Sequence, residues 1–379
     1  MPDEKLTAYR GGKALRRGWT TGSCAAAASQ AAAVLLLTGI APPEIHLHTP
    51  GGITFCLPVE DAHMSGNAAV CTVRKDSGDD PDITNGVRIT ASVRRIEKGV
   101  TIEGGAGVGR ITRPGLAMPV GEAAINPGPR QQIADAVHRA AQQNGYGGGF
   151  SVTISVKDGE ALAAQTYNGH LGIVGGISIL GTSGIVEPMS EKALVDTIRL
   201  ELDSLYAQGQ RIAFLCPGNY GADFARDTLG LDLERAVKCS NFIGEAFDHA
   251  AYRGYPEILL VGHAGKLVKM AAGVMNTHSS VADARQEIFT AHAALCGAGR
   301  ETLELLMQAV SVDACIELLD REGVRESVMA RIQDEMEKRI ARRLKGRAAA
   351  EFIMFTTKYG VLAQSAGAAR LCEKLRKNL

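Results

Sequence analysis

The first half of the chain is dominated by short segments in which apolar and polar residues alternate, the pattern of half-buried β-strands. These segments span residues 44–50, 53–60, 68–76, 86–99 and 150–156. Only two helices are predicted among them. One begins near Thr21 and ends before Gly39, a glycine suited to a helix C-terminus, and the other runs from about Pro129 to Gln143. Few helices among many strands predict an α+β domain.

The second half has a different rhythm, in which continuous apolar runs alternate with amphipathic segments. Strands that break into glycine turns are predicted within 211–221 and 257–266, with a further strand within 235–241. Helices are predicted at 190–209, 222–230 and 243–254, then between Val281 and Lys345, before a late strand within 348–367 and a final helix. This alternation predicts an α/β domain with a mainly parallel, Rossmann-like sheet covered on both faces. We place the boundary near Pro188, giving domains 1–188 and 189–379.

Composition and charge narrow the range of ligands and compartments. The chain has 41 basic and 41 acidic side chains, so no overall field draws it to nucleic acid or to a membrane, and an acidic ligand needs a local basic patch. The eight cysteines contain no C-x-x-C pair, which predicts reduced thiols and no metal site. The run from Ala25 to Leu37 is too short to cross a bilayer and no signal peptide is visible, so we expect a cytoplasmic protein.

The segment that opens the first predicted helix is rich in hydroxyl groups. Thr20, Thr21 and Ser23 can cap a helix N-terminus, and Gly22 permits close approach to its backbone. Such an end attracts carboxylates or phosphates, and Arg16 and Arg17 just before it would add positive charge. The alternative is a well-capped helix that packs tightly on a sheet.

Two further segments of the first half carry polar chemistry. Asp79 and Asp80 belong to the acidic stretch 73–86, which could hold a hard cation, form turns or border a polar substrate. The glycine-rich stretch 102–116 fails as a dinucleotide fingerprint because no helix follows it. Arg110 and Arg113 would instead support an anion-binding loop there.

In the second half, glycine turns follow two apolar strands, and ligands of open parallel sheets bind at such strand ends. The first turn contains Gly218 and Asn219, and the second contains His263 and Lys266 without the spacing of a P-loop. The polar residues Asn276, His278 and Ser279 come shortly afterwards.

Taken in order, these motifs resemble those of the cobalt-precorrin-5B C1-methyltransferase family of anaerobic cobalamin biosynthesis. The segments that carry the resemblance are RRGWTTGSCAAAA, VRKDSGDDPDITNG, GVGRITRPGL, GEAAINPGPR, LGIVGGISILGTSGIVEP, CPGNYG, VKCSNFIG and VGHAGKLVKMAAGVMNTHSSVADARQE. Each is short, but their shared order from Arg16 to Glu287 argues against a chance likeness.

The resemblance implies transfer of a methyl group from S-adenosylmethionine to ring carbon C1 of a cobalt-containing corrinoid, giving cobalt-precorrin-6A and S-adenosylhomocysteine. Cobalt then belongs to the substrate. The usual tetrapyrrole methylase signature is absent from the family and from this chain, so the resemblance indicates the reaction without assigning residues. The expected partner is the small-molecule corrinoid, handed over by a neighbouring pathway enzyme, and a homo-oligomer is compatible with the sequence.

Roles are assigned from the residues themselves. Because open parallel sheets bind ligands at the carboxyl ends of their strands, we expect S-adenosylmethionine at the strand ends of the second domain and the corrinoid between the domains. The expected contacts to S-adenosylmethionine are Gly218, Asn219, Gly262, Gly265 and Lys266. The expected contacts to the corrinoid and its acidic rim are Arg16, Arg17, Thr20, Thr21, Gly22, Ser23, Arg110, Arg113, Asn276, His278 and Ser279. Asp79, Asp80 and His263 are candidates for a base, which is needed only if a proton must leave.

Two other functions fit parts of the sequence. TTGSCAAAAS could be the glycine/serine phosphate loop of a small-molecule kinase, although no second phosphate-binding motif follows in matching order. A non-catalytic corrinoid carrier would bind the ring without using the methyl donor. ATP titration separates the first alternative from a methyltransferase, and a methyl-transfer assay separates the second.

Overall fold

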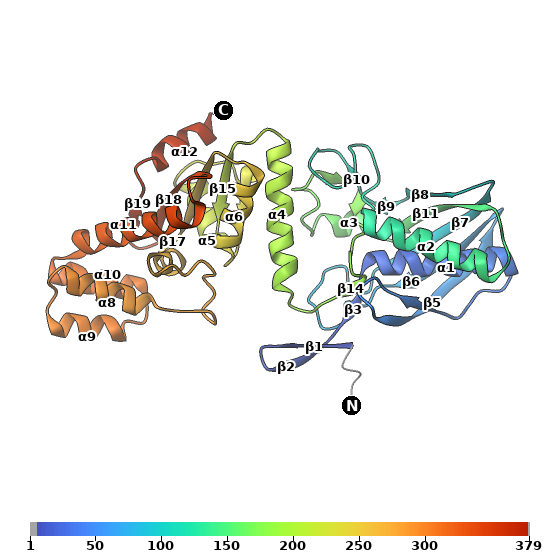
Figure 1. Ribbon diagram of the computed structural model, residues 1–379, viewed down its shortest axis with the longest axis horizontal. Helices are drawn as coiled ribbons and strands as arrows, with labels where there is room; N and C mark the ends of the chain where they lie inside the picture. The colour runs from blue at the N-terminus through green and yellow to red at the C-terminus, as the bar shows by residue number, and fades with distance from the viewer. Residues whose placement is uncertain (1–5, 378–379) are drawn as a thin grey trace. The chain divides into compact units, whose positions relative to one another are not determined.

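A computed structural model describes residues 6–377 of the chain, which divide into two compact units, 1–191 and 192–379. The division falls after Glu191, close to the boundary expected near Pro188. Figure 1 shows the elements of both units, coloured along the chain.

The first unit is built on a six-stranded mixed sheet with the order β4-β5-β6-β7-β11-β8. Its strands are β4 (Glu44–His48), β5 (Thr54–Ser65), β6 (Ala68–Arg74), β7 (Arg88–Ile96), β8 (Val100–Gly104) and β11 (Gly149–Val156). Neighbouring strands are antiparallel except β8 and β11, which run parallel. The predicted strands are confirmed, whereas β8 was not foreseen.

Short strands tie the loops of the first unit together in pairs. They are β1 (Thr7–Arg10) with β2 (Lys13–Arg16), β3 (Gly18–Trp19) with β14 (Ile185–Val186), β9 (Gly107–Val108) with β13 (Gly176–Ile177), and β10 (Arg110–Ile111) with β12 (Ile173–Val174). A short helix, α3 (Gly159–Ala163), follows β11.

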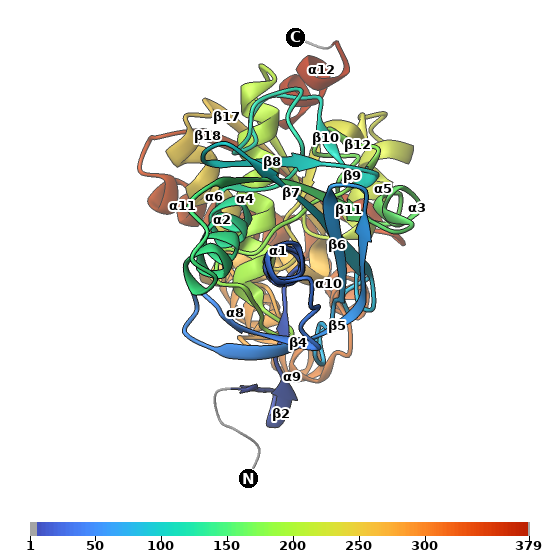
Figure 2. The ribbon, with the colours of Figure 1, turned by 90° about the vertical axis from the view of Figure 1, so that its right-hand side faces the viewer.

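The alanine-rich helix α1 (Thr21–Thr38) lies inside the curled sheet, and α2 (Pro127–Gln143) packs along its open side (Figure 2). The alanines 25–28 and 31–33 are fully buried, because only small side chains let sheet, α1 and α2 approach so closely. Thr20 caps the helix, and Gly39 ends it in the left-handed conformation with φ 75°. Both predicted helices are confirmed.

The prediction that the alanine-rich run is too short to cross a bilayer needs correction. The helix that contains it, α1, has 18 residues and is long and apolar enough to cross a membrane by length and composition. However, 78% of that stretch is buried inside the protein, so the helix packs in the core of the first unit.

The second unit contains a five-stranded sheet with the order β16-β15-β17-β18-β19. Its strands are β15 (Ile212–Cys216), β16 (Ala236–Lys238), β17 (Glu257–His263), β18 (Ala349–Thr356) and β19 (Gly360–Gln364). The first four in this order run parallel, and β19 is antiparallel to β18. The sheet is therefore mixed, and its Rossmann-like character stays a prediction.

Helices cover both faces of this sheet. The helices of the unit are α4 (Glu191–Ala207), α5 (Asn219–Asp227), α6 (Ile243–Arg253), α7 (Ala264–Leu267), α8 (Arg285–Leu295), α9 (Arg300–Gln308), α10 (Val312–Glu322), α11 (Arg325–Leu344), α12 (Ala368–Arg376), and the 3₁₀ turns η2 (Leu233–Arg235) and η3 (Val268–Ala272). Alternate residues of β15 belong to two cores. Phe214 belongs to the core that includes side chains of α5 and α12, and Leu215 belongs to the core that includes side chains of α4, α6 and the helices from α8 to α11.

Candidate functional site

The order of strands in the second unit makes one edge of the sheet a candidate ligand site. From β15 the chain passes to β16 on one side and then returns to β17 on the other. The loops after β15 and β17 therefore leave in opposite directions, and open α/β sheets bind ligands at the carboxyl ends of such strands.

The loop after β15 turns directly into α5 at Gly218. Its φ of 126° and ψ of −178° belong to a region that residues with a Cβ rarely occupy. A Cβ placed there would have the Nζ of Lys266 as its nearest neighbour, at 3.7 Å. Asn219 and Tyr220, the first residues of α5, are exposed. Main-chain N–H groups at this helix start can therefore face a ligand.

Lys266 joins the loops that follow three neighbouring strands. Its Nζ donates to the carbonyl oxygen of Pro217 after β15 at 2.8 Å and to that of Ser240 after β16 at 3.4 Å, while Lys266 itself follows β17. Burial lowers the pKa of this ammonium group. Within residues 6–377 it takes part in no ion pair, so a bound carboxylate would supply the missing counter-charge.

His263 ends β17 and caps α7. Its Nδ1 accepts a hydrogen bond from the backbone N–H of Gly265 at 3.1 Å, which places the proton of the neutral ring on Nε2. Burial lowers the pKa of His263, so the neutral form is favoured. The ring can then donate from Nε2 but offers no lone pair there, and we no longer assign it the role of a base.

An ion pair that had no predicted role lies beside this turn. A Cβ on Gly265 would lie 3.9 Å from a guanidinium nitrogen of Arg285, which itself binds Asp283 through two hydrogen bonds. The loop that leads to this pair is held by the buried Lys269, whose Nζ donates to the carbonyl oxygens of Ala282 at 2.9 Å and Thr277 at 3.2 Å. Lys269 occupies an apolar run, so its sequence context gave no sign of this function.

The predicted polar residues 276–279 lie on that same loop. The Asn276 side chain accepts a hydrogen bond from the backbone N–H of His278 at 3.2 Å, and His278 and Ser279 are exposed. Gly262 is different: a Cβ there would lie 2.2 Å from Leu267 Cδ1, so this glycine permits packing beneath the turn. We therefore remove Gly262 from the expected ligand contacts.

In the first unit, the hydroxyl groups at the start of α1 are used internally. Thr20, Thr21 and Ser23 are all buried. Thr21 Oγ1 accepts from the N–H of Leu180 at 2.9 Å, and Ser23 Oγ donates to the carbonyl oxygen of Gly184 at 2.8 Å.

Gly22 of the same turn is also enclosed. Its N–H donates to the carbonyl oxygen of Leu180 at 3.0 Å, and a Cβ there would lie 2.8 Å from Pro129. The segment 178–184 thus covers this helix end, and the tightly packed alternative replaces the predicted anion site.

The predicted basic and acidic residues near the N-terminus of the first unit pair with one another. Arg16 binds Asp76 through two hydrogen bonds of 2.7 and 2.8 Å, and these lower the pKa of the Asp76 carboxyl. Asp79 accepts from the backbone N–H of Arg16 at 2.6 Å. Asp80 accepts from that of Met189 at 2.9 Å.

Arg17 continues this network through an ion pair with Glu187 at 2.9 Å. These contacts fasten the β1–β2 hairpin and the segment 187–189. Asp79 and Asp80 therefore serve structure, and we no longer assign them the role of a base.

Arg110 is the first residue of β10, and Arg113 lies on the loop that follows this strand. Arg110 is half exposed and donates to Glu103 and to the carbonyl oxygen of Gly121, both at 3.1 Å. The aliphatic part of the Arg113 side chain packs against Gly172, where a Cβ would lie 2.5 Å from Arg113 Cγ. The guanidinium group of Arg113 has no hydrogen bond or ion pair within the described part of the chain. Arg113 is therefore the better placed of the two to meet an external carboxylate.

Comparison with known proteins agrees with the motifs. The sequence profile of the CbiD family matches residues 8–188, and that of the CbiD C-terminal domain matches residues 276–366. A cobalt-precorrin-5B C(1)-methyltransferase from Ruminiclostridium cellulolyticum is 50% identical over 92% of this chain and 90% of its own length. Proteins of the same name from Alkaliphilus metalliredigens and Salmonella typhimurium are 42% and 45% identical over 96% and 82% of both chains.

A solved structure is also similar in sequence. It is the crystal structure of the cobalamin biosynthesis protein CbiD from Archaeoglobus fulgidus, with 30% identity, 74% of this chain and 88% of that chain covered, and a TM-score of 0.40. The family profiles and the identity across nearly full length agree, and we conclude that the chain belongs to the CbiD family.

Proposed function

We propose that this chain transfers a methyl group from S-adenosylmethionine to C1 of cobalt-precorrin-5B, giving cobalt-precorrin-6A and S-adenosylhomocysteine in the cytoplasm. The observation that carries the proposal is 50% identity to a protein of that name over nine tenths of both chains. Identity at this level, without large gaps in coverage, supports a shared reaction.

The strand-end residues of the second unit suit the methyl donor. Lys266 offers an ammonium group that forms no ion pair with any of the residues 6–377, which fits the carboxylate of the donor's methionine part. Gly218 lets the donor approach the main chain at the start of α5, and Asn219 adds an exposed amide. The His263 Nε2–H can donate to a hydroxyl or ring nitrogen of the adenosine. We therefore propose a Rossmann-like use of this mixed sheet.

The donor supplies a methyl group already activated on a sulfonium sulfur. The protein's task is then to hold the sulfur, methyl and ring carbon in line, which is a matter of position rather than of proton transfer. This agrees with the state of His263, whose Nδ1 already accepts from Gly265 and whose Nε2 can donate but not accept a hydrogen bond. The turns at Gly218 and Lys266, which Lys266 links through its hydrogen bond to Pro217, would hold the donor in place.

The acidic rim of the corrinoid needs cations and hydrogen-bond donors. In the first unit we assign this role to Arg113 and Arg110, and in the second unit to Asn276, His278 and Ser279. Exposure of Arg110, His278 and Ser279 supports the assignment, as does the unpaired guanidinium of Arg113 within residues 6–377.

A turnover assay tests the function. Cobalt-precorrin-5B and S-adenosylmethionine are incubated with the protein, and S-adenosylhomocysteine is measured. We expect its formation to depend on both substrates. Corrinoid binding without S-adenosylhomocysteine would favour a carrier, and binding of ATP without binding of S-adenosylmethionine would favour a kinase.

A pair of variants tests the donor site. Lys266→Met should weaken the binding of S-adenosylhomocysteine about tenfold or more in calorimetry, since a charged hydrogen bond is lost. Lys192→Met removes an exposed lysine from α4 and should leave binding unchanged. Equal affinities in the two variants, or density for S-adenosylhomocysteine in the first unit of a soaked crystal, would refute this site while leaving the reaction itself open to the turnover assay.

A further inference from the structure

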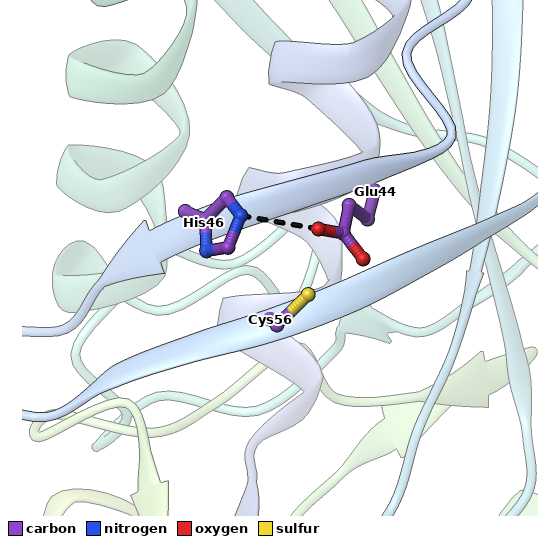
Figure 3. Close-up of side chains that lie close together, drawn as sticks. All are labelled: Glu44, His46 and Cys56. Carbon is purple, nitrogen blue, oxygen red and sulfur yellow. Dashed lines mark ion pairs between the residues drawn. The ribbon is translucent and has the colours of Figure 1, made fainter.

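Three side chains that commonly bind transition metals gather on the outer face of the sheet in the first unit. Glu44 and His46 lie on β4 and Cys56 lies on β5 (Figure 3). One oxygen of Glu44, one ring nitrogen of His46 and the sulfur of Cys56 all lie within 4.8 Å of one another. None of these residues has a role in the proposed methyl transfer.

The strand register brings the three together. In the antiparallel pair β4–β5, His46 lies directly opposite Cys56, and Glu44 precedes His46 by two residues, so all three point to one face. On the other face Ile45, Leu47, Phe55 and Leu57 are buried in the core. This burial fixes the backbone beneath the cluster, so the three side chains start from fixed positions.

Glu44 already binds both of its neighbours. One of its oxygens lies 3.1 Å from Nε2 of His46. It also accepts a hydrogen bond from the Cys56 thiol, which raises the pKa of that thiol. The carboxylate oxygen, the ring nitrogen and the sulfur can each donate an electron pair to a cation, so one ion can replace these contacts.

We propose that Glu44, His46 and Cys56 form a site for one divalent transition-metal ion of the zinc type, which fastens the edge strand β4 to β5. A thiolate, an imidazole and a carboxylate are the ligands that Zn²⁺ accepts, whereas Mg²⁺ and Ca²⁺ take oxygen ligands. Since all three residues are exposed, water can fill the fourth position of a tetrahedron.

The binding step is an exchange of protons for metal. The Cys56 thiol releases its proton to solvent and the sulfur donates an electron pair to the ion, while the neutral His46 nitrogen and the Glu44 carboxylate each donate another. No electron is transferred to or from the protein. Ligand atoms around one zinc ion lie ~3.3–3.8 Å apart when bonded at about 2.0–2.3 Å. The exposed side chains can close the remaining distance by rotating about their own bonds.

The cysteine pattern makes the test specific. All eight cysteines belong to the described residues, and Cys56 alone among them is exposed. The full-length, tag-free protein is stripped of metal, kept reduced and titrated with Co²⁺ in the absence of corrinoid. A thiolate-bound Co²⁺ gives a charge-transfer band in the near ultraviolet, and added Zn²⁺ should abolish it.

The wild-type protein should bind one Co²⁺ per chain with this band. Cys56→Ser should lose the band, and His46→Gln and Glu44→Gln should each weaken Co²⁺ binding about tenfold or more. Below the thiol pKa, affinity should rise with pH as one proton is released per ion. Cys296→Ser tests a partly exposed cysteine, and His63→Gln tests an exposed histidine beside Asp61. Both controls should bind like the wild type.

Other results overturn the site. A wild-type protein without the band at millimolar Co²⁺ has no such site. A band that survives in Cys56→Ser belongs to another thiol, and unchanged affinity in His46→Gln or Glu44→Gln reduces the cluster to a surface ion pair beside a cysteine. Circular dichroism of each variant checks that β4 and β5 remain folded.

Discussion

Glu201 of α4 is a buried carboxyl group in the core of the second unit, and its protonation should control the stability of that unit. Only 8% of the residue is exposed. Burial raises the pKa of Glu201 from its ordinary value of 4.5 to about 7, although Lys238 at the end of β16 opposes the shift. The informative change is Glu201→Gln, which keeps the shape and removes the charge.

The size and sign of the effect follow from these pKa values. A pKa raised in the folded state means that the folded protein holds the proton more tightly than the unfolded chain. The stability from the protonated group is therefore complete below pH 4.5 and is lost as the pH rises through about 7. The rise in pKa from 4.5 to about 7 corresponds to about 3 kcal/mol, at ~1.4 kcal/mol per pKa unit.

Urea unfolding of wild type and Glu201→Gln between pH 4.5 and pH 8 measures this loss. Far-ultraviolet circular dichroism follows the second unit, which holds most of the helices. Trp19, the chain's single tryptophan, reports the first unit and should show no change. Relative to wild type, the variant should gain about 3 kcal/mol between the two pH values.

The control is Glu373→Gln, which removes an exposed carboxylate from α12 of the same unit. Its stability difference from wild type should be nearly constant with pH. If Glu201→Gln also shows a constant difference, or loses stability as the pH rises, Glu201 is ionised in the folded protein without cost and the reasoning fails.

Two further predictions concern packing. Gly78→Ala places a Cβ 2.1 Å from a backbone carbonyl oxygen of β2 at a φ of 65°, whereas Gly86→Ala meets nothing within 4 Å at a φ of 78°. Gly78→Ala should lower the unfolding free energy of the first unit by more than about 2 kcal/mol, and Gly86→Ala should lower it by about 1 kcal/mol. Urea unfolding followed by Trp19 fluorescence measures both values, and equal losses would contradict the crowding at Gly78. Tyr255→Phe removes a buried hydroxyl that donates to the carbonyl oxygen of Leu202 at 2.7 Å, and should cost about 1 kcal/mol by circular dichroism; no loss would mean that this bond adds nothing.

The sequence predicted an element correctly where the residues next to its ends determine where it begins and stops, as in α1. Thr20 and Gly39 bound α1 because capping and left-handed backbone are decided within one turn of the chain. The strand β8 was not predicted because it has only five residues and ends in Glu103 and Gly104, residue types that are uncommon in strands. Its parallel pairing with β11 joins positions about fifty residues apart, which periodicity cannot reveal.

The predicted anion site failed for the same reason. The hydroxyls of Thr21 and Ser23 signal a helix N-terminus, but the segment that covers it lies 157 and 161 residues further along the chain at Ser178 and Gly184. No local pattern records that contact. The sequence did predict that the turns at Gly218 and Lys266 lie at one edge of the sheet. Each turn follows an apolar strand, and the carboxyl ends of parallel strands meet at the same edge.

The roles of two groups of residues depend on hydrogen bonds or on strand register, which the sequence alone does not show. His263 was recognised as polar and near a strand end, but its role as donor follows from the bond to Gly265. The cluster of Glu44, His46 and Cys56 could not be predicted from the spacing of metal ligands along the chain. Its members meet only through the cross-strand pairing of His46 with Cys56.

The central claim is methyl transfer to one ring carbon, and isotope labelling tests it most directly. The protein is incubated with cobalt-precorrin-5B and S-adenosylmethionine labelled with ¹³C in its methyl group, and the corrinoid product is examined by NMR spectroscopy. We predict one labelled methyl group per ring, bonded to C1, with one S-adenosylhomocysteine formed for each. An unlabelled ring, or label at any other position, would contradict the account.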